Sequence, residues 1–280
     1  MRITKTLLLK FSLVVILLLG RQSPFACEAI NKTFLSSVNA RVILLGEIHG
    51  SVEMPAFVGN LVCHFAKEKR AVILGLEMPA SMQAHFNEFM ASQGTADDRE
   101  RLLAAEFWTT AKDYGQASSA IFALVEQERS LKMSGYPVLL FAFDGSEERS
   151  HQKISDSEKM IPRDFMMGVN IAMRALQYEH HQVVVLTGNL HAEKNSEDNR
   201  MPSYIEKFLP VFSARFMPAV GGEAWGCYGR SIETMKCGVR DLNTDTRDVA
   251  PGYDAIIKME RLHAAPPAIQ TAKGIGAKAD

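Results

Sequence analysis

The sequence lacks an excess of charge of either sign. Its 280 residues include 31 lysines and arginines against 32 aspartates and glutamates, so the formal net charge is −1. A chain without a basic field does not attract the phosphate backbone, which argues against nucleic acid as a partner. With 47% hydrophobic and 22% charged residues, the composition is that of a globular protein and not of a disordered or collagen-like chain.

Cysteine is also scarce, with four in the whole chain and no Cys-x-x-Cys pair. This count excludes a disulfide-dense scaffold and argues against a structural zinc site. In an oxidising compartment, the spacing of Cys227 and Cys237 predicts a disulfide that closes a short loop. Cys63 lies in an expected helix, and we predict that it is a buried hydrophobic residue.

Long hydrophobic runs are missing as well, except at the N-terminus. There, basic residues precede the apolar stretch 11–20, which is too short to span a bilayer comfortably, and small residues follow it. This layout is typical of a secretory signal peptide, which we place at residues 1–29 with cleavage after Ala29. An uncleaved N-terminal anchor helix is the alternative.

The location that follows is secreted or periplasmic, in a bacterium. Lipidation at Cys27 is a less favoured alternative, because Pro24 stands where a lipoprotein signal usually has an aliphatic residue. Attachment to a membrane would depend on that lipid. Removal of residues 1–29 takes away four basic residues and one acidic residue, so the formal charge becomes −4.

Short, continuously apolar runs alternate with amphipathic helical patterns. Such runs are expected of parallel strands covered on both faces. Four of them lie at residues 41–46, 71–76, 137–143 and 182–188. Two later stretches, 211–216 and 254–259, are also predicted to be strands, toward the sheet edges. We therefore predict an α/β fold with a mostly parallel central sheet and helices on both faces.

The chain after the signal peptide is predicted to form a single domain over residues 30–264. A helical insertion of about three helices, at residues 81–134, separates the second strand from the third and is long enough to form a lid. Residues 265–280 have little to bury, so we expect them to be a disordered tail.

Polar residues follow the ends of the first four expected strands, where sites form in sheets of this kind. They are Glu47, His49, Glu77, Asp144 and His191. Glu47 and His49 stand two residues apart, so both point to the same face of an extended chain. Taken singly, each is most simply a turn or helix-cap residue. Their coincidence at successive strand ends favours a functional site.

Two chemistries suit this set of side chains. A carboxylate beside an imidazole orients it and raises its basicity, as a general base requires, so the set can activate water for hydrolysis. Alternatively, His49, Glu77 and His191 can ligate a divalent metal ion that activates the water.

Further charged residues near these strand ends are weaker candidates. Glu53 suits either a helix N-terminus or a ligand site. Arg163 and Asp164 open the helix before the fourth strand. There, Arg163 either binds an anionic group, pairs with a strand-end glutamate, or forms a surface salt bridge. Glu53, Asp144 and Asp164 are candidates for ligand binding, whereas His263 is expected to have no partner. Tyrosines have the chemistry to ligate haem iron, but no spacing selects one.

The two Gly-x-x-His motifs, at 46–49 and 188–191, together with Glu77, resemble the Tiki superfamily. Within it, the chain is most similar to the ChaN-type haem-uptake proteins. That similarity rests on Arg163-Asp164-x-x-Met167 and on residues 201–204 and 253–257, and the likeness extends over about residues 38–262. The pattern His49-Gly50-x-x-Glu53 also resembles the erythromycin-esterase branch, where related Glu and His residues serve hydrolysis.

The resemblance implies a secreted protein that binds haem or iron for uptake, with a homodimer as one option. The alternative is a hydrolase of esterase or peptidase type that uses Glu47, His49, Glu77 and His191, with Arg163. The cofactor is accordingly haem or a divalent metal ion, and the partner is a small molecule.

Overall fold

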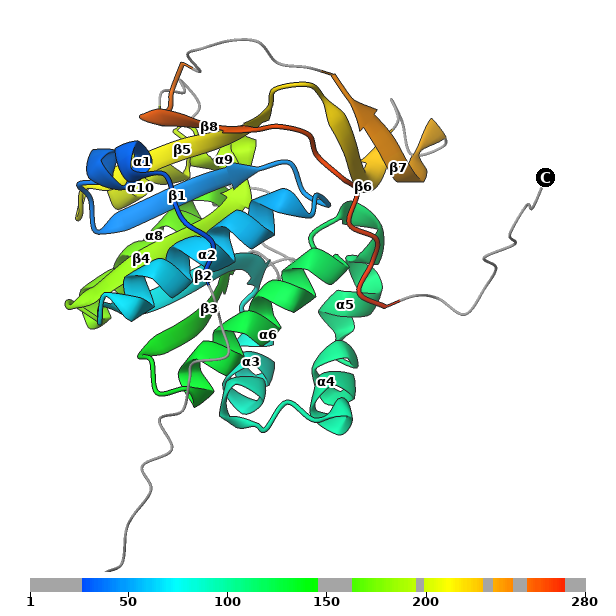
Figure 1. The fold of residues 1–280 in the computed structure, drawn as a ribbon, viewed down its shortest axis with the longest axis horizontal. Helices are drawn as coiled ribbons and strands as arrows, with labels where there is room; N and C mark the ends of the chain where they lie inside the picture. The colour runs from blue at the N-terminus through cyan, green and yellow to red at the C-terminus, as the bar shows by residue number, and fades with distance from the viewer. Residues whose placement is uncertain (1–26, 146–162, 195–198, 229–233, 244–250, 270–280) are drawn as a thin grey trace, which may run out of the picture.

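A computed structural model describes the chain as one α/β unit (Figure 1). The described residues are 27–145, 163–194, 199–228, 234–243 and 251–269. Most of the predicted signal peptide, and the end of the predicted tail from residue 270, lie outside them. Among the described residues, no helix is both long and apolar enough to cross a bilayer.

The centre of the fold is a six-stranded, all-parallel sheet in the order β3-β2-β4-β1-β5-β8. Its strands are β1 (Val42–Glu47), β2 (Ala71–Pro79), β3 (Val138–Asp144), β4 (His181–Gly188), β5 (Val211–Pro218) and β8 (Ala255–Met259). Every residue of β1 is buried, because helices cover both faces of the sheet. The predicted fold class is therefore confirmed. One detail was wrong, since β5 lies between β1 and β8 and not at an edge.

Successive residues of each strand enter two separate cores. Ile43 and Leu45 of β1 face one core, and Val42 and Leu44 face the other. The first core is closed by α1 (Lys32–Ser37), α2 (Glu53–Lys67), α3 (Met82–Ala91) and α6 (Ser119–Met133), and the second by α8 (Arg163–Gln177), α9 (Asn189–Ala192) and α10 (Met201–Ile205). In Figure 1, α2 and α6 lie in front of the sheet and α8 lies behind it.

The helical insertion between β2 and β3 is present and contains more helices than expected. Besides α3 and α6 it holds α4 (Ala96–Leu103), α5 (Glu106–Thr110) and the 3₁₀ turn η1 (Lys112–Tyr114). The last helix, α6, packs on α2 and β3 and so belongs to the layer that covers the sheet. The segment around η1 reaches the strand ends, where Tyr114 and Gln116 line a cavity.

An antiparallel hairpin lies beyond the end of the sheet and was not predicted. Its strands are β6 (Gly222–Tyr228) and β7 (Lys236–Leu242), and Cys227 lies opposite Cys237 in their register. The predicted disulfide between these cysteines is confirmed, and it joins two paired strands. The hairpin escaped prediction because β7 is largely exposed and has no continuous apolar run.

The C-terminal segment is ordered further than the sequence suggested. The Ala265 N–H donates to the Gly50 carbonyl, and the Ala268 N–H donates to the Ala117 carbonyl. Ala265 is fully buried. A disordered tail was therefore the wrong prediction for residues 265–269. Composition could not reveal this, because backbone groups make these contacts, and any residue but proline can donate from its backbone.

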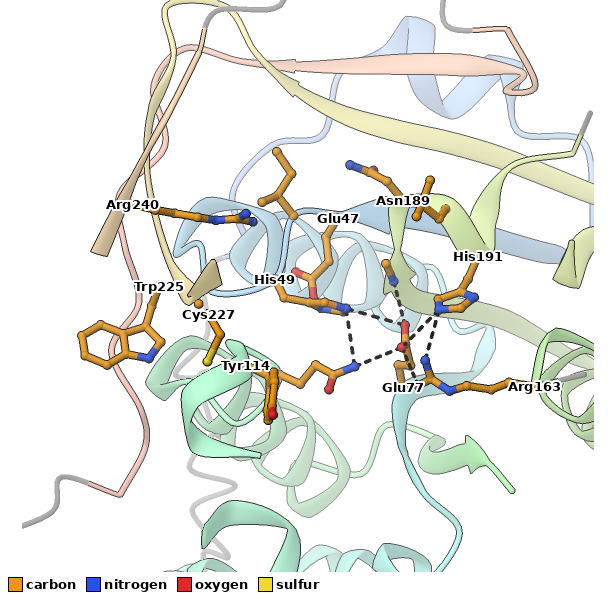
Figure 2. Close-up of a pocket in the computed structure, with 15 residues that line it drawn as sticks. Glu47, His49, Glu77, Tyr114, Arg163, Asn189, His191, Trp225, Cys227 and Arg240 are labelled. Atoms are coloured by element: carbon orange, nitrogen blue, oxygen red, sulfur yellow. Dashed lines mark hydrogen bonds and ion pairs between the residues drawn. The ribbon is translucent and has the colours of Figure 1, made fainter. Parts of the chain in front are cut away.

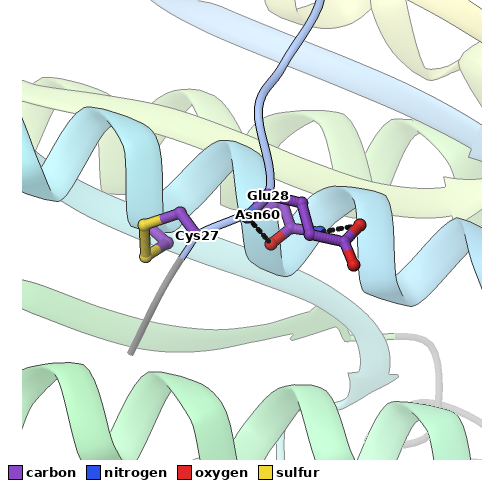
Figure 3. The surroundings of a disulfide bond; sticks show 4 residues. Cys27, Glu28 and Asn60 are labelled. Carbon is purple, nitrogen blue, oxygen red and sulfur yellow. Dashed lines mark hydrogen bonds between the residues drawn. A yellow bond between two sulfur atoms is a disulfide. The ribbon is translucent and has the colours of Figure 1, made fainter. Parts of the chain in front are cut away.

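Cys63 is buried as predicted, but it is not free. It forms a disulfide with Cys27, which ties the N-terminal segment to α2 (Figure 3). Beside it, the Glu28 N–H donates to Asn60 Oδ1 at 2.9 Å. A chain cleaved after Ala29 would lose this disulfide, and a lipid on the Cys27 sulfur would compete with it.

We expect the folded protein to retain Cys27. Its intact mass should show an N-terminus at or before Cys27, and iodoacetamide should label no thiol until reduction, because all four cysteines are paired. The Cys63→Ser variant should expose one reactive thiol and lose roughly 2–4 kcal/mol of unfolding free energy in urea titration. One labelled thiol in the unreduced wild-type protein would contradict this expectation.

Candidate functional site at the strand ends

A cavity of about 480 Å³ opens at the carboxyl ends of the parallel strands, on the side of the β6–β7 hairpin (Figure 2). This volume is within the range of small-molecule sites. Its polar walls include Glu47, His49, Glu77, Gln116, Arg163, Asn189, His191 and Arg240, and its apolar or aromatic walls include Ile48, Tyr114, Leu190 and Trp225.

Glu47 and His49 form a hydrogen-bonded pair at the end of β1. His49 Nδ1 lies 2.8 Å from Glu47 Oε1, with Glu47 almost fully buried and the His49 side chain 24% exposed. The chain turns at Gly50 with φ +82°, and a Cβ there would lie 1.9 Å from the Trp225 carbonyl oxygen. Only glycine allows this close approach, which places His49 against the hairpin.

The second carboxylate, Glu77 of β2, accepts four hydrogen bonds. It accepts from Arg163 Nη2 at 2.8 Å, from Thr187 Oγ1 and the Gly188 N–H at 2.7 Å each, and from Gln116 Nε2 at 3.0 Å. Burial alone would raise the pKa of Glu77. The charges of His49, His191 and Arg163, with the Gly188 hydrogen bond, overcome that effect and lower the pKa to about 2. Glu77 is therefore an anion at any physiological pH.

The pKa of His49, unlike that of Glu77, is raised. Burial lowers the pKa of this imidazole, but the hydrogen bond to Glu47 and the negative charges of Glu77 and Glu47 outweigh it, so the pKa is raised above 6.5. His49 Nε2 faces the cavity, 3.8 Å from Glu77 Oε2. This nitrogen is a stronger base than that of an ordinary histidine.

Arg163 enters from the first turn of α8 and is held by two carboxylates. Its Nε and Nη2 donate to Asp144 Oδ2 at 2.9 and 2.7 Å, and Nη2 also donates to Glu77. Burial opposes the charge, but Glu77 and Asp144 prevail and raise the pKa of the guanidinium. Asp144 does not line the cavity, so its contribution to the site is to orient Arg163.

A second imidazole–carboxylate pair faces the first across Glu77. His191 Nδ1 lies 2.7 Å from Asp164 Oδ1, and His191 Nε2 lies 3.2 Å from Arg163 Nη1. In Figure 2, Glu77 lies between the two imidazoles. A Cβ on Gly188 would lie 3.1 Å from His49 Nε2 and 3.6 Å from His191 Cδ2, so glycine leaves open the space on which both rings converge.

Five of the predicted site residues line this one cavity, namely Glu47, His49, Glu77, Arg163 and His191. Asp144 and Asp164 lie behind them and orient Arg163 and His191. Glu53 is not among the lining residues. It begins α2 and binds His263 through the backbone N–H at 3.0 Å and through Nδ1, so His263 has a partner after all.

The proposed metal ligands do not form a metal site. In the parts of the chain that the structure describes, no three His, Cys, Asp or Glu side chains are placed to hold an ion. The Arg163 guanidinium already donates to both Glu77 and His191, at 2.8 and 3.2 Å. The positive charge of Arg163 thus lies next to Glu77 and His191, two of the three predicted metal ligands. This arrangement does not fit a divalent metal ion.

Gln116, Trp225 and Arg240 also line the cavity and were not predicted from the sequence. Gln116 comes from the segment before α6, and its Nε2 lies 3.0 Å from Glu77 Oε1 and 3.5 Å from His49 Nε2. Trp225 and Arg240 come from the hairpin. None of them follows a strand of the main sheet, so the rule that located the other site residues could not find them.

Comparison with known proteins places the fold. No family model and no curated protein matches the sequence. A solved succinoglycan biosynthesis protein superposes with a TM-score of 0.60 at 12% identity, covering 87% of this chain and 93% of that one. The erythromycin esterase EreC, solved as a mutant in its open conformation, gives 0.54 at 11% identity over 79% and 82%. The chain has the fold of EreC.

The sequence resembled the erythromycin-esterase branch in one motif. The superposition on EreC confirms the fold that this resemblance implied. A structure of ChaN from Campylobacter jejuni with cofacially bound haem also matches, with a TM-score of 0.41 at 13% identity over 75% of this chain and 91% of that one. A score that low does not assign haem binding to this chain.

The charge of Glu77 should make stability depend on pH. A carboxyl whose pKa is lowered by folding stabilises the protein above its unfolded pKa and loses that effect as pH falls toward 2. In urea titrations, the wild type should lose roughly 3 kcal/mol between pH 6 and pH 2 from this group. Glu77→Gln should remove that part of the dependence, whereas Glu68→Gln, at an exposed carboxyl, should not. Parallel curves for wild type and Glu77→Gln would contradict the expectation.

Proposed function

We propose that the protein is a hydrolase that cleaves an ester with a water molecule activated by His49. The observation that carries the proposal is the Glu47–His49 pair. His49 Nδ1 lies 2.8 Å from Glu47 Oε1, while His49 Nε2 faces a cavity of small-molecule size. An imidazole oriented by a carboxylate, with its second nitrogen toward the cavity and a raised pKa, has the properties of a general base.

In the proposed reaction, His49 Nε2 takes a proton from water as the water oxygen attacks the ester carbonyl. Glu47 holds the ring in the tautomer that keeps Nε2 free and stabilises the imidazolium that forms. When the carbonyl re-forms, the bond to the alcohol oxygen breaks, and His49 returns the proton to that oxygen. The products are a carboxylic acid and an alcohol, and His49 is neutral again.

Arg163 supplies positive charge beside Glu77. Its Nη1 lies outside the bonds to Asp144 and Glu77, and His191 lies next to that nitrogen. Negative charge develops on the carbonyl oxygen during the attack, and preorganised donors stabilise it. Arg163 is held by Asp144 and Glu77, and His191 is held by Asp164, so neither must reorganise as the reaction proceeds.

Two further features support the proposal. EreC, which shares the fold, is an esterase by name. The two disulfides suit an oxidising compartment, and we propose on that basis, with the N-terminal sequence, that the protein acts as a secreted or periplasmic enzyme.

Hydrolysis of a panel of 4-nitrophenyl esters tests the proposal. His49→Ala should lower kcat about 10²–10⁴-fold. The acid limb of the kcat/KM profile should report a pKa above 6.5, because the base must be neutral and folding raises its pKa. Glu47→Gln should move that limb to lower pH.

The matched control is His64→Ala, since His64 lies on α2, pairs with Glu68 and is absent from the cavity wall. It should retain wild-type rates. The proposal fails if no ester of the panel is hydrolysed, or if His49→Ala and His64→Ala behave alike.

Haem is a second candidate ligand, because one tyrosine, Tyr114, lines the cavity and can ligate haem iron. Tyr114 is 55% exposed and lines the cavity together with Trp225, so its phenol can reach a ligand there. Tyr253 is less suitable, because it donates to the Asn189 carbonyl and burial raises its pKa to about 12.

If haem binds, titration of the protein with micromolar haem should shift the Soret band, and Tyr114→Phe should abolish the shift. Tyr228→Phe, on the exposed end of β6, is the control. No Soret shift in the wild-type protein would rule this candidate out.

A further inference from the structure

The cavity contains two arginines whose surroundings differ. Arg163 is ion-paired with Glu77 and Asp144. Arg240 also lines the cavity, but no ion pair and no hydrogen bond of its side chain occurs with the residues that the structure describes. Its Nε is buried without an acceptor. The guanidinium therefore has unused donors, and a ligand in the cavity that brings acceptors would satisfy them.

The direction of Arg240 matters as much as its lack of a partner. Figure 2 shows its guanidinium extending from the hairpin toward Glu47 and His49, on the opposite side of the cavity from Arg163. A substrate whose carbonyl is placed at His49 would therefore have a second part beside Arg240.

The hairpin that carries Arg240 is fixed relative to His49. The Cys227–Cys237 disulfide joins its two strands, and Arg240 on β7 lies opposite Ala224 on β6. The Trp225 N–H donates to the Gly50 carbonyl at 2.8 Å, one residue after His49. The backbone that carries Arg240 is thus held in a constant position with respect to the proposed base.

From these observations we propose that the substrate carries a carboxylate remote from its ester bond, and that Arg240 binds this carboxylate. The planar guanidinium matches a carboxylate through two parallel hydrogen bonds, which a lysine does not provide. Arg163 is unsuited to this purpose, because its Nε and Nη2 donate to Asp144 and Glu77, which leaves Nη1 alone and no pair of parallel donors for a carboxylate. This inference rests on the proposed esterase function and names its substrate class.

Two esters of equal chain length measure the effect of the charge. Mono-4-nitrophenyl adipate ends in a carboxylate, and 4-nitrophenyl hexanoate ends in a methyl group. The wild type should prefer the adipate ester in kcat/KM. Arg240→Ala should lower the ratio of the two values at least tenfold, mainly through KM for the adipate ester. Arg240→Lys should restore only part of the ratio.

Lys236→Ala provides the control, since Lys236 lies on the same strand, is exposed and is absent from the cavity wall. It should leave the ratio unchanged. An equal ratio in wild type and Arg240→Ala, or an equal fall in Lys236→Ala, would overturn the inference.

Binding of free adipate, followed by calorimetry, separates this inference from the proposed function. If no ester is hydrolysed but wild type binds adipate and Arg240→Ala does not, the anion site stands and the esterase proposal fails. If esters are hydrolysed but adipate binds wild type and Arg240→Ala equally, the esterase proposal stands and the anion site is wrong.

Discussion

The charge of Glu77 is the constraint on which the whole site depends. A carboxylate removed from water is tolerated only among donors and positive charges. Glu77 obtains them from Thr187, Gly188, Gln116 and Arg163, with the two imidazoles on either side. These partners come from separate parts of the chain, so one anion holds together β2, the end of β4, the segment before α6 and the start of α8.

The parallel sheet makes this assembly possible. Because β2, β4 and β1 are neighbours and run in the same direction, their carboxyl ends deliver Glu77, Gly188 and Glu47 to one edge. This edge of the sheet forms one side of the cavity in which the proposed reaction takes place. The hairpin and the C-terminal segment close the opposite side, and both donate to the Gly50 carbonyl, directly beside His49. The position of the proposed base is thus set from the sheet below and from later parts of the chain above.

Much of the part of the site at the strand ends could be predicted from the sequence, because strands and the residues that follow them have local sequence patterns. Continuous apolar runs marked four of the six strands of the sheet, and polar residues after those four marked the site. The segments on the opposite side of the cavity could not be predicted in the same way. Strand β7 is mostly exposed and has no periodic pattern, residues 265–269 bind through their backbone, and Gln116 follows a short 3₁₀ turn. Such contacts leave no trace in composition or spacing.

By itself, the sequence determined the α/β class, the two Gly-x-x-His strand ends and the pair Glu47–His49, since residues two apart on a strand share a face. Only the tertiary structure decided which distant groups meet. Cys63 forms a disulfide with Cys27, Arg163 pairs with Asp144 and Glu77, and Glu53 pairs with His263. Arg240 lines the cavity and has no carboxylate partner among the described residues. The physical reason is that periodicity records local burial, whereas the partner of a charge is set by how the packed elements lie against one another.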